Sequence, residues 1–270
     1  MNLDRLRARP AARATARTTA RVALRPWAAL TASATALVLL AGCVSVRVEG
    51  PVEATARTEP TVAQARVQHQ AIDYDWVDAA RGRAVPVRLY WPTEVAPGTP
   101  VPLVVFSHGI GGSRLGYSYL GRYFAEHGIA SLHLQHVGSD INLWFGSPWE
   151  LVGRLQSAAQ ESEAVARVGD LRYALDQVLA GEYGARIDRS RIVAAGHSYG
   201  ANTALLAAGA RVPRGGQVVD LRDPRIRAAI LMSAPPFYGE GDEERILRHV
   251  QVPTLHITAT EDVIRIPGYY

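Results

Sequence analysis

Short, continuously apolar runs alternate with longer amphipathic stretches from residue 71 onward. Residues 71–92 read as two apolar-polar runs on either side of "AARGR", which predicts an antiparallel hairpin. The run "VPLVVFSHG" predicts a buried strand, and "SRLGYSYLGRYFAEHG" predicts an amphipathic helix that ends at a glycine. The run "IASLHLQH" predicts the next strand.

The same alternation continues to the end of the sequence. A loop rich in Trp and Gly precedes a single long helix, which the spacing of apolar residues predicts over about residues 155–180. The runs "RIVAAG", "IRAAILMSA" and "VPTLHITA" predict three more strands, and "ANTALLAAGA" predicts a helix after the first of them. Strands separated by helices indicate the α/β class, with a mostly parallel sheet covered on both faces. We therefore expect one domain over residues 71–270.

Composition supports one globular core and argues against a nucleic-acid partner. The 270 residues are 48% hydrophobic and 20% charged, which suits a single sizeable core. The formal net charge of +4 is concentrated at the amino terminus, because residues 1–42 hold seven of the 29 basic residues and one of the 25 acidic residues. The remaining chain has 22 basic and 24 acidic residues. This near-neutral body gives no support for binding nucleic acid.

The amino terminus has the pattern of a targeting segment. An Arg-rich stretch is followed by the uncharged run "WAALTASATALVLLAGC", which is short for a membrane span and typical of a signal peptide. Its end, "LAGC", resembles the lipobox of bacterial lipoproteins, in which the cysteine is lipidated; Cys43 is the only cysteine of the chain. We expect a signal peptide over residues 1–42 and a flexible tether over 43–70. The lipid on Cys43 would then anchor the domain to a membrane of the cell envelope, on its periplasmic or extracellular side.

The segment "RIVAAGHSYGANTALLAAGA" contains a Gly-x-Ser-x-Gly motif at residues 196–200. The motif alone is weak, but here it lies between a predicted strand and a predicted helix, which is the setting of a nucleophile elbow. In that setting Ser198 is the candidate nucleophile. The alternative is a serine in a tight turn that takes part in no chemistry.

A second segment, "FSHGIGG", follows the strand "VPLVV" and would lie beside this elbow at the carboxyl edge of the sheet. Ester hydrolysis needs two backbone N–H groups that point at the oxyanion of the tetrahedral intermediate. Tyr199 and Ile110 are the candidate donors. His108 is expected to order the loop rather than to act as a base.

The order of these elements, with "HGIGG" and "GHSYG" at its two turns, resembles the α/β-hydrolase fold. The segments "VVFSHGIGG", "LQHVGSD" and "GHSYGANTALLAAG" resemble dienelactone-hydrolase-like proteins and the platelet-activating-factor acetylhydrolase group. The resemblance implies a catalytic acid after the last predicted strand, which makes Asp262 the candidate. Glu261 is the near alternative, and Asp242 or Glu240 are weaker ones. Asp262 also suits a helix N-cap.

The triad of this fold runs Ser, acid, His along the chain, and no histidine follows Asp262. His256 lies within the preceding strand, His249 lies before it, and His197 is expected to point away from the nucleophile into the sheet. The resemblance therefore implies a domain truncated at its carboxyl end, without the last strand and the loop that carries the catalytic histidine.

These features predict a membrane-tethered serine hydrolase of carboxylic esters or short acyl groups, with a small-molecule ester as substrate. Trp144, Phe145 and Trp149 would form an apolar wall over the acyl pocket or pack on the domain surface. The alternative function is a non-catalytic envelope lipoprotein that uses the fold as a binding module. A true dienelactone hydrolase is disfavoured, because it would need a cysteine nucleophile. We expect no cofactor and no metal, because the sequence has neither a phosphate-binding loop nor a Cys/His cluster with metal spacing.

Overall fold

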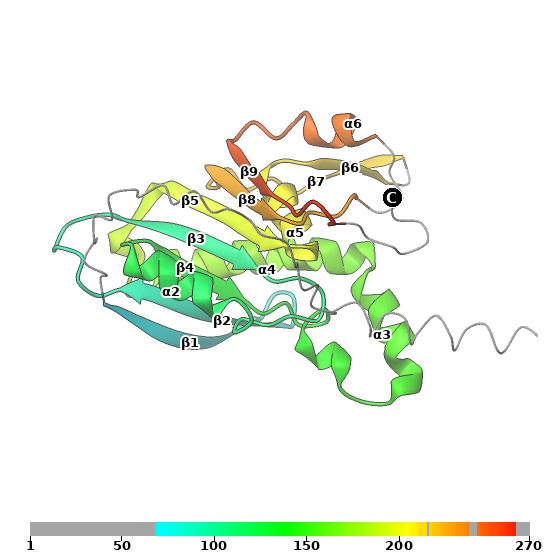
Figure 1. The fold of residues 1–270 in the computed structure, drawn as a ribbon, viewed down its shortest axis with the longest axis horizontal. Helices are drawn as coiled ribbons and strands as arrows, with labels where there is room; N and C mark the ends of the chain where they lie inside the picture. Colours follow the sequence, from blue (N-terminus) through cyan, green and yellow to red (C-terminus); the bar gives the residue numbers. More distant parts are fainter. Residues whose placement is uncertain (1–67, 215, 238–241, 263–270) are drawn as a thin grey trace, which may run out of the picture. The chain divides into compact units, whose positions relative to one another are not determined.

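A seven-stranded sheet forms the centre of the described part of the chain, with strand order β1-β2-β4-β3-β5-β8-β9. The computed structural model describes residues 68–214, 216–237 and 242–262, all within the second of two units, Met1–Thr61 and Val62–Tyr270 (Figure 1). The predicted signal peptide, Cys43 and all but the last three residues of the predicted tether lie outside the described residues. No described helix combines the length and the apolar character that crossing a bilayer requires.

The strands are β1 (His69–Asp78), β2 (Arg83–Pro92), β3 (Val101–Ser107), β4 (Ala130–Leu134), β5 (Ile187–His197), β6 (Arg211–Arg214), β7 (Gln217–Asp220), β8 (Ala228–Met232) and β9 (Thr254–Ile257). The α-helices are α2 (Ser118–Glu126), α3 (Leu151–Ala158), α4 (Glu161–Ala180), α5 (Tyr199–Ala208) and α6 (Glu243–Leu247). Three short 3₁₀ turns are η1 (Ile141–Trp144), η2 (Pro148–Glu150) and η3 (Gly184–Arg186).

The pairing of the strands confirms the predicted hairpin and the mostly parallel sheet. Strands β1 and β2 pair antiparallel from His69 opposite Pro92 to Asp78 opposite Arg83. Strand β2 also pairs antiparallel with β4, whereas the pairs β3–β4, β3–β5, β5–β8 and β8–β9 are parallel. The carboxyl ends of β3, β5, β8 and β9 therefore meet at one edge, where loops of such sheets carry functional residues.

Helices cover the sheet on both faces (Figure 1). Helices α4 and α5 pack on one face and enclose the larger apolar core, which includes Leu103, Leu171 and Leu205. Helix α2 packs on the other face over a smaller cluster that includes Phe106. Nine of the ten residues of α5 are buried, because its many alanines let the helix approach the sheet closely.

Several details differ from the sequence-based prediction, among them helix α6, which was not predicted. The single helix predicted over 155–180 is two helices, since Gln160 adopts an extended conformation (ψ 151°) between α3 and α4. Its carbonyl accepts hydrogen bonds from the N–H groups of Glu163 and Ala164, which starts the second helix. The small β6–β7 hairpin was also not predicted.

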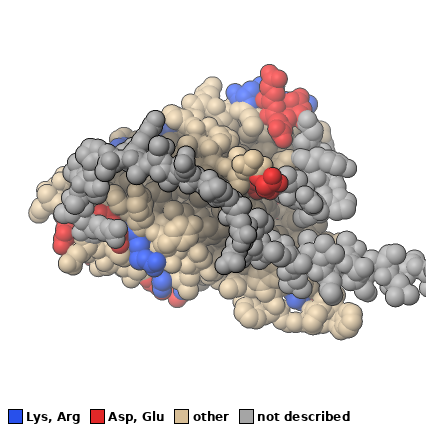
Figure 2. All heavy atoms as spheres, in the orientation of Figure 1, with Lys and Arg blue, Asp and Glu red and all other residues tan. Residues whose placement is uncertain are grey.

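Charged side chains are sparse on the described surface that Figure 2 shows, and they gather around α6 and in a second group at the lower left of the view. Strand β9 forms one edge of the sheet, and all four of its residues are exposed. The large apolar side chains Leu255 and Ile257 are among them.

Candidate active site

The turn between β5 and α5 holds Ser198 in a backbone conformation that few residues adopt. Ser198 has φ 53° and ψ −123°, and among the described residues only Ser233 shares a positive φ without being glycine. Its N–H donates to the carbonyl of Met232 at 2.9 Å. A strained conformation at the end of a central strand is the expected signature of a nucleophile elbow.

The two glycines of the motif are required by close backbone contacts. A Cβ on Gly196 would lie 2.1 Å from the carbonyl oxygen of Gly200, and a Cβ on Gly200 would lie 1.9 Å from the carbonyl oxygen of Ser107. Both contacts are with backbone atoms, which cannot rotate away. The motif therefore lets the elbow pack directly against the carboxyl end of β3.

The loop after β3 lies against the nucleophile. A Cβ on Gly109 would meet the Cβ of Ser198 at 3.3 Å, so Ile110 is one residue from this contact. Within the described residues no acceptor is bonded to the Ile110 N–H. Tyr199 begins α5 immediately after Ser198, so its backbone N–H is adjacent to the candidate nucleophile in the chain. Both predicted oxyanion donors thus lie beside Ser198.

A neighbouring segment fixes the shape of this loop. The Gly111 N–H donates to the Ser139 carbonyl at 2.8 Å, and Gly112 forms a parallel bridge with Asp140. The indole Nε1 of Trp144 donates to the Gly111 carbonyl at 2.9 Å. The loop is thereby tied to residues 139–144 along its length.

The side chain of His108 holds the loop and does not reach out as a base. Its Nδ1–H donates to the Gly109 carbonyl at 2.6 Å, and its Nε2 accepts from the His136 N–H at 3.0 Å. Burial, reinforced by the charge of Arg167, lowers the pKa of His108 well below its usual value. His108 is therefore a neutral structural group.

Beneath the loop lies a chain of groups with the chemistry of a triad. His136 Nδ1 is 3.0 Å from an Asp170 carboxylate oxygen, and its Nε2 is 3.0 Å from Ser107 Oγ. All three residues have 0% of their surface exposed, so no substrate reaches the Ser107 hydroxyl. Arg81 and Arg83 pair with the same carboxylate, so the group is a buried structural network and not a second active site.

Asp262 follows β9 at the edge that carries Ser198. The Thr258 hydroxyl donates to its carboxylate at 2.8 Å, and hydrogen bonds from Ser233 and then Thr258 lower the pKa of Asp262. Burial lowers the pKa of His197, the residue before Ser198, and the negative charge of Asp262 partly offsets this lowering. Ser233, with its positive φ, is a neighbour of the acid that sequence reasoning did not find.

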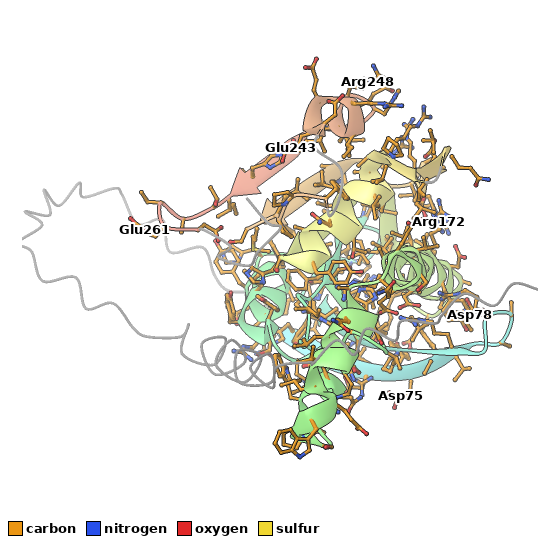
Figure 3. All side chains as sticks on the ribbon, turned by 90° about the vertical axis from the view of Figure 1, so that its right-hand side faces the viewer. Asp75, Asp78, Arg172, Glu243, Arg248 and Glu261 are labelled. Atoms are coloured by element: carbon orange, nitrogen blue, oxygen red, sulfur yellow. The ribbon has the colours of Figure 1, made fainter. Side chains whose placement is uncertain are left out.

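The alternative acids have other positions. Glu261 lies at the outer end of the segment after β9 (Figure 3) and is exposed. Asp242 caps α6 by accepting from the Arg245 N–H at 2.9 Å. Glu240 lies outside the described residues.

No described histidine is hydrogen-bonded to Ser198. The ring of His197 is half-buried, and its Nδ1 is 2.7 Å from the Tyr117 hydroxyl, a partner that the sequence did not indicate. His249 lies beside Arg211 at 3.5 Å, and His256 is exposed on β9.

The three aromatic side chains of the predicted wall differ in their exposure and in their contacts with the site. Trp144 is 50% exposed and donates a hydrogen bond to Gly111 in the loop after β3, which we call the oxyanion loop. Phe145 and Trp149 are 65% and 92% exposed. Only Trp144 is thus tied to the site. Among the described residues no cluster of three or more His, Cys, Asp or Glu side chains has the arrangement of a metal site.

Residues 104–269 match the model of the alpha/beta hydrolase family, which is more than half of the chain. The chain belongs to the alpha/beta hydrolase family. The parallel sheet, the elbow at Ser198 and the glycine-rich loop after β3 are arranged as this family requires.

Three known proteins are similar to this chain in sequence or in structure. Platelet-activating factor acetylhydrolase of the dog, Canis lupus familiaris, is 25% identical over 150 residues, with coverage of 43% of this chain and 34% of that protein. The match thus spans about a third of the relative's length. A ferulic acid esterase from Streptomyces cinnamoneus is similar with a TM-score of 0.51 and 19% identity, over 74% of this chain and 75% of that one. A dienelactone hydrolase from Anabaena variabilis gives 0.48 and 20%, over 70% and 74%.

Proposed function

We propose that the chain is a serine hydrolase of carboxylic esters or short acyl groups that acts through an acyl-enzyme on Ser198. Family membership supports a hydrolase. The observation that carries the finer proposal is the strained conformation of Ser198 at the β5–α5 junction, with the Gly109 loop packed against its Cβ. Strain of this kind is maintained where it exposes a reacting group.

In the proposed reaction, the Ser198 hydroxyl attacks the ester carbonyl, and the carbonyl oxygen becomes an oxyanion. The N–H groups of Ile110 and Tyr199 donate to it, which stabilises the tetrahedral intermediate. The catalytic histidine takes the Ser198 proton and gives it to the leaving oxygen as the ester C–O bond breaks, so the group departs as the alcohol. Water then attacks the acyl-enzyme, gives its proton through the same histidine to Ser198 Oγ, and releases the acid.

Asp262 is proposed as the acid that orients the catalytic histidine. Hydrogen bonds from Ser233 and Thr258 favour its ionised form, and an ionised carboxylate is the form that holds an imidazole in the correct tautomer. None of residues 263–270 is a histidine, so the catalytic histidine of this proposal is not among the residues that follow Asp262 in this sequence.

Trp144 supports an apolar acyl pocket in this proposal, since its half-exposed ring is fixed beside the oxyanion loop. The lipid anchor on Cys43 is proposed from the sequence alone. It would hold the enzyme at a membrane of the cell envelope.

A fluorophosphonate probe tests the nucleophile. In a folded protein that contains the domain together with its catalytic histidine, we expect the probe to label the peptide that contains Ser198, and Ser198→Ala to abolish both labelling and hydrolysis of p-nitrophenyl butyrate. The matched control is Ser190→Ala, because Ser190 is exposed on β5 and hydrogen-bonded to Asp188, away from the elbow. Absence of labelling in a folded sample would refute the proposal and favour the non-catalytic binding module.

A further inference from the structure

Arg167, near the middle of α4, is a completely buried cation whose hydrogen bonds all go to segments of the candidate site. It has 0% of its surface exposed. A buried charge is costly unless its donors are used, and a guanidinium offers five donors in a fixed plane. The groups that accept hydrogen bonds from Arg167 therefore indicate the role of this residue.

One side of the guanidinium holds the oxyanion loop. Its NH2 group donates to the His108 carbonyl, which is the peptide group before Gly109 and Ile110. Its NH1 group donates to Ser139 Oγ at 2.7 Å, and the carbonyl of Ser139 accepts from the Gly111 N–H. Two hydrogen bonds thus fix the loop on either side of Ile110.

The other side holds the helix that begins at the nucleophile. Arg167 Nε donates to Thr203 Oγ1 at 3.0 Å, and the Thr203 hydroxyl donates to the Tyr199 carbonyl at 3.1 Å. The guanidinium carbon also lies 4.5 Å from the centroid of the Tyr199 ring, within the range of a cation–π contact. Tyr199 is the residue that carries the second oxyanion donor.

The charge of Arg167 is balanced inside the same network. Ser139 Oγ donates to Glu163 at 2.7 Å, and Glu163 lies one turn before Arg167 on α4. Burial lowers the pKa of Arg167 to about 10, so the group stays charged at neutral pH. The charged guanidinium therefore keeps all of its N–H donors for the hydrogen bonds to these partners.

We propose that Arg167 is a positioning residue that fixes the Ile110 and Tyr199 N–H groups relative to each other. The inference rests on the proposed serine-hydrolase function. One side chain connects the two strand ends that supply the two donors, Ile110 and Tyr199, which are 89 residues apart in the sequence. Preorganised donors stabilise an oxyanion because they need no rearrangement during the reaction.

A substitution by lysine separates this role from a general contribution to packing. Arg167→Lys keeps the positive charge and most of the apolar stem, but a single ammonium group cannot reach all of the partners in one plane. Arg172→Lys is the matched control, because Arg172 lies on the same helix, on its solvent side (Figure 3), and donates to the Arg222 carbonyl.

The first measurement is steady-state hydrolysis of p-nitrophenyl butyrate by a protein that contains the domain together with its catalytic histidine. For Arg167→Lys we expect kcat to fall by about 10²-fold with KM changed less than about threefold, because oxyanion donors act on the transition state. Arg172→Lys should keep both constants within about twofold. Unchanged kcat in a folded Arg167→Lys protein overturns the inference.

The second measurement is backbone hydrogen exchange, which does not need activity. We expect Arg167→Lys to speed exchange in peptides covering residues 108–112 and 199–203, and Thr203→Val, which retains the arginine, to speed exchange in the second alone. Exchange unchanged in both segments, or raised equally throughout the domain, overturns the inference even if the wild type is inactive. If the wild type is inactive but Arg167→Lys shows the expected exchange pattern, the result contradicts the proposed function and not the positioning role of Arg167.

Discussion

His133 gives a quantitative prediction about the acid stability of the fold. Its ring lies on β4, stacked 4.8 Å from Phe106 and edge-on 5.0 Å from Tyr90, and its Nε2 is 2.9 Å from Ser131 Oγ. Burial, with a smaller effect of the Arg88 charge, lowers the pKa of His133 from 6.5 to about 3. The folded protein therefore keeps this imidazole neutral where the unfolded chain protonates it.

The sign of the effect follows from this difference. The stability contributed by neutral His133 is complete above about pH 6.5 and is lost as the pH falls, because the unfolded state binds the proton first. With 1.36 kcal/mol per pKa unit, the loss is about 2 kcal/mol at pH 5 and approaches ~4 kcal/mol near pH 3.

We expect His133→Phe to remove this term. The free energy of unfolding, measured by urea titration at pH 8 and pH 5, should fall by about 2 kcal/mol less in the variant than in the wild type. Comparing the two pH values in each protein cancels the cost of the lost Ser131 hydrogen bond. The control is His127→Phe, because His127 is exposed at the end of α2 and should leave the pH dependence unchanged. Equal pH dependence in His133→Phe and wild type would show the reasoning to be wrong.

Two further predictions concern the elbow and the acyl pocket. Gly200→Ala should lower Tm by several degrees, since the new Cβ meets the Ser107 carbonyl oxygen at 1.9 Å. The control, Gly153→Ala in α3, should raise Tm slightly, because its new Cβ has nothing within 4 Å. A Tm of Gly200→Ala at or above that of the wild type contradicts this prediction. Trp144→Ala should raise KM for long-chain p-nitrophenyl esters more than for the acetate, and an equal effect on both would remove Trp144 from the pocket.

The layered fold was predictable because its signals are local. The continuous apolar runs gave β3, β5 and β8, and the "AARGR" turn gave the β1–β2 hairpin. The break at Gln160 was missed because no glycine or proline marks it, and only the backbone conformation separates α3 from α4. The β6–β7 hairpin was missed because its strands have four residues each, too few for a clear alternation.

The site was predictable only where a residue lies next to a glycine motif or a strand end. Ser198, Tyr199 and Ile110 were predicted in this way, and the structure places them close together. Arg167 was not found, because a buried arginine in a helix has the same sequence signature as an exposed one. Only three-dimensional contacts reveal that its partners come from the loop after β3 and from α5, which are far apart in the chain.

The dispersed origin of the site has a consequence for how the protein folds. The oxyanion loop follows β3, the nucleophile follows β5 and Asp262 follows β9, so the site is closed by contacts between residues far apart in the chain. Such non-local contacts form late, because each requires the closure of a long loop. A nascent chain that has been synthesised only as far as α4 contains the loop after β3 and Arg167 but not yet Ser198. If Ser198 is the nucleophile, as proposed, a nascent or partly unfolded chain would therefore lack activity until these distant segments are in contact.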